Sequence, residues 1–179
     1  MNSMKSRIFS VLALCLLIST TGFAQNKKAV NLDEQIKLNG KVRTGKLANG
    51  LTYYVRANNK PANRAEFQIA VNAGSVLEEA NEVGLAHFSE HMGFNGTKHY
   101  PGNTMIDDLE KEGIVFGREI NAYTGFDQTV YMVTLPTDNS RLFDMGLKIL
   151  DGWASGMLMT GEEIDKERGV IIEEWRMSQ

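Results

Sequence analysis

Residues 84–92 read Gly-Leu-Ala-His-Phe-Ser-Glu-His-Met, the most informative stretch in this chain of 179 residues. It lies within a segment, 82–94, whose residue pattern predicts a helix. A helix advances about 100° per residue, so His87 and His91 project from one face and can share a metal ion. Glu90 stands beside them, placed to reach a water on that metal. The alternative is a helix whose histidines are ordinary surface or core residues.

Two further acidic residues follow near the end of the sequence. The segment 160–163, Thr-Gly-Glu-Glu, is a capping box and predicts a helix that runs to the end of the chain. Glu167 and Glu174 are about two turns apart and share a face with Ile171. Carboxylates on the apolar side of a helix are costly unless they are paired or metal-bound. Glu173 points about 100° away, toward solvent. The alternative is that these glutamates all form an acidic surface.

The rest of the sequence predicts a sheet followed by helices. Alternating apolar residues and Gly, Asn or Pro turn signals predict four strands, at 51–55, 67–71, 115–123 and 129–135. Helical spacing and capping residues predict two more helices, at 103–112 and 138–155. Strands joined by short turns and followed by helices favour the α+β class: a mostly antiparallel sheet with helices packed on it.

The first 24 residues resemble a secretory signal peptide. Lys5 and Arg7 precede a short apolar run from Ile8 to Ile18, and small residues precede a cleavage site after Ala24. A membrane anchor is the alternative, but this run is too short to cross a hydrocarbon core that needs about 20 residues. We therefore expect an exported protein without a stable membrane anchor, with residues 25–44 as a polar lead-in.

Composition limits the function classes. A hydrophobic fraction of 42% argues against a disordered chain. A formal net charge of −3 argues against nucleic acid as a partner. The only cysteine, Cys15, lies in the predicted signal peptide, so the mature chain has no disulfide. These features fit a bacterial periplasm.

The motifs together resemble a known family. His-x-x-Glu-His is the inverted zinc motif of the inverzincins. With its surroundings, and with the blocks at 49–51, 73–75, 121–124 and 167–174, it resembles the pitrilysin/insulinase-type metallopeptidases and the mitochondrial processing peptidases. The blocks occur in the family's order, and the resemblance covers nearly all of residues 45–176.

The resemblance implies a zinc site and its chemistry. His87, His91 and Glu174 look like the three Zn²⁺ ligands, and Glu90 looks like the general base. Glu167 resembles the family's supporting glutamate, which helps to hold the site. His99, in a predicted loop away from this face, is interpreted as a surface histidine.

The resemblance also implies how substrate binds. Asn121 and Ala122 fall where the family offers a strand edge to a peptide or unfolded protein. We therefore expect a zinc-dependent metalloendopeptidase, with residues 45–179 as its N-terminal catalytic domain, incomplete at the C-terminus. The remaining domains of the polypeptide, or a partner half, would close the site, so this piece alone is expected to be poorly active. The alternatives are a non-catalytic structural half and a metal-binding fragment without hydrolysis.

Overall fold

The computed structural model describes residues 32–178, in two compact units divided after Arg56. The predicted signal peptide therefore lies outside the described residues. In the first unit, strands β1 (Val42–Lys46) and β2 (Thr52–Arg56) form an antiparallel hairpin. Gly50 takes a positive φ at its turn, where Leu51 N–H donates to the Asn49 side chain. The predicted strand at 51–55 is confirmed as β2, whereas β1 was not predicted, because its Val-Arg-Thr-Gly-Lys sequence has little apolar alternation.

The second unit contains the predicted antiparallel sheet. Its strand order is β3–β5–β4, with β5 (Thr129–Pro136) between β3 (Arg64–Val71) and β4 (Ile120–Thr124). The predicted strand at 115–123 starts earlier than β4, the strand that the structure contains there. Gly117, with a positive φ of 81°, turns the chain, and its N–H donates to the Ile120 carbonyl, so the extended segment starts only at Ile120.

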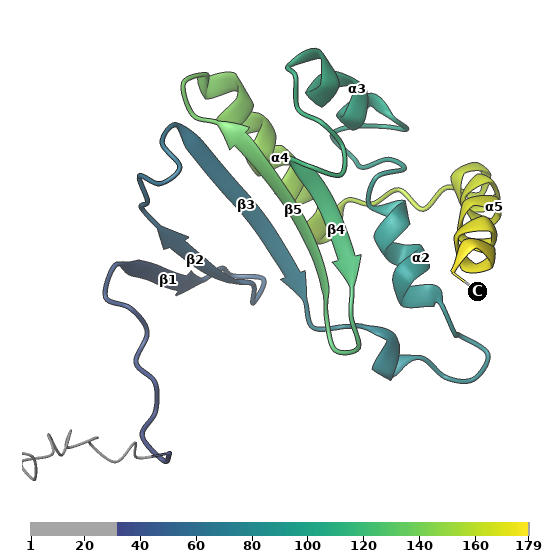
Figure 1. Ribbon diagram of the computed structural model, residues 1–179, viewed down its shortest axis with the longest axis horizontal. Helices are drawn as coiled ribbons and strands as arrows, with labels where there is room; N and C mark the ends of the chain where they lie inside the picture. The colour runs from purple at the N-terminus through teal and green to yellow at the C-terminus, as the bar shows by residue number, and fades with distance from the viewer. Residues whose placement is uncertain (1–31, 179) are drawn as a thin grey trace, which may run out of the picture. The chain divides into compact units, whose positions relative to one another are not determined.

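Helices pack on this sheet as expected, which confirms the α+β class (Figure 1). The short η1 (Ser75–Leu77) precedes α2 (Leu85–Met92), α3 (Thr104–Lys111), α4 (Ser140–Ser155) and α5 (Gly161–Met177). The core is shared by the sheet, α3 and α4 and includes Phe67, Leu109, Val133, Leu135, Leu142, Ile149 and Trp153. In the described part of the chain no helix is long and apolar enough to span a membrane.

Helix α2 is shorter than the predicted 82–94. It begins only after Gly84, whose φ of 94° is incompatible with a helix, and it ends at Met92. Two buried aromatic residues anchor its last turn to the core: Tyr131 donates to the Ser89 carbonyl at 3.2 Å, and Trp153 donates to the Gly93 carbonyl at 2.9 Å. The helix that carries both histidines is thus fixed against the sheet and α4.

Helix α5 lies beside α2, on the side away from the edge strand β4 (Figure 1). Its first turn is capped as predicted, because the Thr160 side chain accepts from the Glu163 N–H. A short antiparallel bridge ties the connection before α5 to the loop after α2. There Thr97 pairs with Met157, and the Leu158 N–H donates to the Gly96 carbonyl. This bridge brings residues far apart in sequence to one place.

Candidate metal centre

Three side chains from α2 and α5 form a group that could hold a metal ion. One ligand atom from each of His87, His91 and Glu174 lies within 4.8 Å of the others. The two Nε2 atoms are 3.1 Å apart, and Glu174 Oε2 lies 3.7 Å from that of His87 and 3.5 Å from that of His91. Two imidazole nitrogens and one carboxylate are a donor set that suits zinc in sites with an open fourth position.

The second nitrogen of His91 is held by Glu167. Its Nδ1 lies 2.7 Å from Glu167 Oε1, and the Glu167 side chain is only 12% exposed. A carboxylate can only accept here, so Nδ1 carries a proton, and in the neutral ring Nε2 then has a lone pair for a metal. The Asn95 amide donates to the other oxygen of Glu167. The seven-residue spacing of Glu167 and Glu174 thus places both carboxylates against the histidines.

Glu90 points toward the sheet rather than into the ligand group. It is 8% exposed, and its Oε2 accepts a hydrogen bond from the Thr124 hydroxyl on β4 at 2.7 Å. Tyr131 packs nearby, and its pKa is raised by burial and by the charge of Glu90. A buried carboxylate with one oxygen fixed by a hydroxyl is well oriented for proton transfer.

Glu78 supplies the cap that α2 lacks locally. Gly84 has no side chain, but the Glu78 carboxylate accepts from the N–H groups of Gly84 at 2.9 Å and Ala86 at 2.8 Å. These two hydrogen bonds, Ala86 first, hold the pKa of Glu78 below its ordinary value. A carboxylate at the N-terminus of a helix also interacts favourably with the helix dipole. Glu78 therefore fixes the first turn of the helix that presents His87.

The other residues singled out from the sequence lie elsewhere. Asn121 and Ala122 are in β4, opposite Met132 and Tyr131 of β5. Glu173 is 63% exposed and pairs with Arg176, as expected for a surface glutamate.

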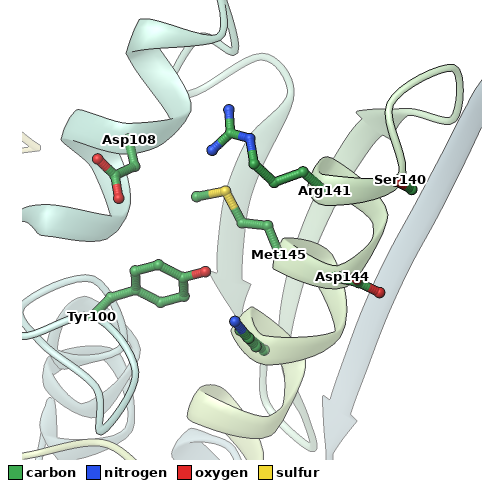
Figure 2. A pocket seen from close by; sticks show the side chains of 7 residues that line it. Tyr100, Asp108, Ser140, Arg141, Asp144 and Met145 are labelled. Carbon is green, nitrogen blue, oxygen red and sulfur yellow. The ribbon is translucent and has the colours of Figure 1, made fainter.

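His99 is outside the ligand group, and its Nε2 lies 2.6 Å from the carboxylate of Asp151 on α4. A separate hollow of about 430 Å³ lies between α3 and α4 and contains none of the ligand group (Figure 2). It is lined by side chains of both charges, which include Asp108, Asp144, Arg141 and Lys148.

Three residues that contact this candidate centre were not predicted as site residues from the sequence. Asn95 follows His91 by four positions, the same spacing that relates the two histidines, and this could have been recognised. Thr124 was noticed only as part of a block, because its partner is 34 residues away. Glu78 caps a helix from outside it, which no short motif describes.

Comparisons with known proteins show which family the chain resembles. The family model for Insulinase (Peptidase family M16) matches residues 53–179. The probable zinc protease PqqL of Escherichia coli (strain K12) is 45% identical over 139 residues, 78% of this chain. The chloroplastic stromal processing peptidase of Arabidopsis thaliana is 34% identical over 142 residues, 76% of this chain and 10% of that protein.

A solved structure shares the fold. The first half of the periplasmic protease PqqL from Escherichia coli matches with a TM-score of 0.76 and 43% identity, over 80% of this chain and 31% of that one. This chain spans only 15% of the PqqL protein of Escherichia coli and 18% of the one from Haemophilus influenzae. Each likeness therefore concerns a small part of a longer protein.

Proposed function

The chain belongs to the insulinase (M16) family of peptidases, and from that premise we propose that it carries the zinc site of a metalloendopeptidase. The observation that carries the proposal is the convergence of His87, His91 and Glu174, with Glu90 in the same helical turn as His91. The runner-up functions, a structural half or a metal-binding module without hydrolysis, do not require a buried carboxylate at position 90.

The residues present fit zinc. Two neutral imidazoles and a carboxylate are the protein ligands of one class of catalytic zinc site. The Glu167–His91 pair reproduces the carboxylate–histidine arrangement that fixes the orientation of a metal-binding ring. When bound there, Zn²⁺ would lower the pKa of a water to about 7 and polarise a carbonyl.

Glu90 acts as the general base and then as the general acid. Its carboxylate accepts a proton from the attacking water and returns it to the amine that leaves. Thr124 fixes Oε2 of Glu90, which leaves Oε1 to take and return that proton. The Glu90 side chain is 8% exposed, so little bulk water competes for this carboxylate.

The peptide would bind along β4, which lies at the edge of its sheet. The Thr134 N–H donates to the Glu119 carbonyl, so these two residues form a hydrogen-bonded pair across the strands. Hydrogen-bonded and non-hydrogen-bonded pairs alternate along an antiparallel ladder, so the N–H and carbonyl of Ala122 point away from β5. An extended peptide or unfolded protein can pair with this open edge as an added strand. The Asn121 side chain accepts from the Ala122 N–H at 2.9 Å, and an arriving strand would compete for that donor.

We further propose that the protein works in the periplasm, with residues 1–24 as the export signal and 45–179 as the catalytic domain. The similarity to a periplasmic protease supports the location. Other domains of the polypeptide, or a partner half, would complete the substrate chamber, since the relatives are much longer than this chain.

The test is a Glu90→Gln variant in an active form of the protein. We expect unchanged zinc content and loss of peptide cleavage, because the amide keeps the shape of the side chain but cannot accept the proton. Ser89→Ala, at the exposed neighbouring position, is the matched control and should cleave normally. Unchanged cleavage by Glu90→Gln would refute the assignment. Zinc binding without cleavage in the wild type, removed by a chelator, would favour the metal-binding module.

A further inference from the structure

Asn95 contacts the supporting carboxylate of the metal centre but is not one of its ligands. Its amide Nδ2 donates to Oε2 of Glu167, while Oε1 of the same carboxylate holds His91 Nδ1. Both oxygens of this nearly buried group are thus engaged by different donors. An ionised carboxylate has no hydrogen to donate, so the amide must present its nitrogen rather than its oxygen.

The second hydrogen bond has a mechanical consequence. The terminal torsion of a glutamate has a broad, shallow preference, so one hydrogen bond alone leaves the carboxylate free to swing. A second donor on the opposite oxygen fixes the carboxylate plane. The ring of His91 then has a fixed partner, which sets both its proton position and the direction of Nε2.

The backbone of Asn95 is itself held from two sides. Its N–H donates to the Met92 carbonyl, which continues the last turn of α2. The next residue, Gly96, has a φ of 123° and accepts from the Leu158 N–H in the connection before α5. Asn95 therefore occupies a fixed point between α2 and the segment that leads into α5, the helix that carries Glu167.

We propose that Asn95 is a positioning residue of this centre, which holds Glu167 so that His91 keeps its proton on Nδ1 and directs Nε2 at the metal. The inference rests on the proposed zinc-peptidase function. The contacts then run from Asn95 in the loop after α2 to Glu167 on α5, and from Glu167 to His91 on α2. Asn95 touches neither metal nor substrate and acts only through Glu167.

The test compares Asn95→Leu, which keeps the volume but removes the donor, with Asn103→Leu at an exposed asparagine whose side chain makes no capping hydrogen bond. Zinc affinity is measured by competition with a chromophoric chelator. Asn95→Leu should weaken it at least tenfold, within the range seen when partners of metal ligands are removed, and Asn103→Leu should not. The isosteric Asn95→Asp removes the donor and also sets a second carboxylate against Glu167, so it should show at least the same loss, and it covers the case in which the leucine variant fails to fold.

A second readout separates positioning from general structural damage. Long-range ¹H–¹⁵N spectra of the metal-free protein report which nitrogen of His91 is protonated. The wild type should show the Nδ1–H form, and Asn95→Asp a mixture of the two forms. Wild-type zinc affinity and a wild-type His91 spectrum in both variants would overturn the inference. A wild-type chain that binds no zinc would instead overturn the proposed function, while the His91 spectra would still decide the role of Asn95.

Discussion

Replacing Gly93 by alanine tests how tightly α2 is fixed against the core. Gly93 follows directly after the histidine motif, and its φ of −62° and ψ of −17° suit alanine as well as glycine. The backbone therefore gives no reason for glycine, and only the space around it does. A Cβ at this position would lie 2.5 Å from Cε1 of Tyr131, 3.0 Å from the Glu90 carbonyl oxygen and 3.3 Å from Cε of Met157.

The Tyr131 ring cannot move away cheaply. It is 3% exposed, it stacks on Trp153 with ring centroids 5.3 Å apart, and its hydroxyl donates to the Ser89 carbonyl. Overpacking of this kind costs about 1–3 kcal/mol. The lower entropy of the unfolded chain returns about 0.4–1 kcal/mol when glycine becomes alanine. We therefore expect Gly93→Ala to lower the free energy of unfolding by about 1–2 kcal/mol.

Urea unfolding followed by circular dichroism measures this difference. The control is Gly169→Ala, in the exposed middle of α5, where a Cβ meets nothing within 4 Å. That variant should be more stable than the wild type, by about 0.5–1 kcal/mol, because alanine favours a helix. The two substitutions are chemically identical and differ in expected sign. If Gly93→Ala were as stable as the wild type, the packing argument would be wrong.

Three further outcomes are expected. Glu78→Gln should reduce stability by about 1 kcal/mol at pH 7 through loss of the charged helix cap. Because backbone hydrogen bonds lower the pKa of Glu78, the contribution of Glu78 to stability is present above its ordinary pKa and is lost as the pH falls through the lowered pKa. Urea unfolding should therefore show a smaller difference between wild type and Glu78→Gln at pH 3 than at pH 7. Equal differences at the two pH values would contradict this. Thr124→Val should slow cleavage of a fluorogenic peptide about tenfold or more while zinc is retained. The reason is that a hydrogen bond to a charged group is worth about 1.5–3 kcal/mol. A normal rate would show that the Thr124 hydroxyl does not hold Glu90. Glu174→Gln should weaken zinc binding at least tenfold in a chelator competition, whereas Glu173→Gln should not, and the reverse order would exchange their roles.

Local sequence was sufficient for much of the fold. The strands β2, β3 and β5 and the helices α3, α4 and α5 follow from apolar periodicity, capping residues and turn signals, all of which act over a few residues. The predicted strands are wrong where a pairing strand or a single backbone angle determines whether a segment is extended. β1 forms because it pairs with β2, and the start of β4 is delayed by the turn at Gly117.

For the candidate metal centre, the amino-acid sequence was enough to predict which side chains share a helix face. His87 and His91 on α2, and Glu167 and Glu174 on α5, are placed together by helical geometry alone. How the two faces meet depends on contacts between distant segments. Glu174 lies beside both histidines, and Glu167 holds Nδ1 of His91. Asn95 contacts Glu167, Thr124 contacts Glu90, and Glu78 caps α2. Helical periodicity relates residues on neighbouring turns, so it can be recognised from the local sequence. Contacts between α2 and α5 depend instead on the buried core and on the bridge between residues 97 and 157, which fix the two helices in space.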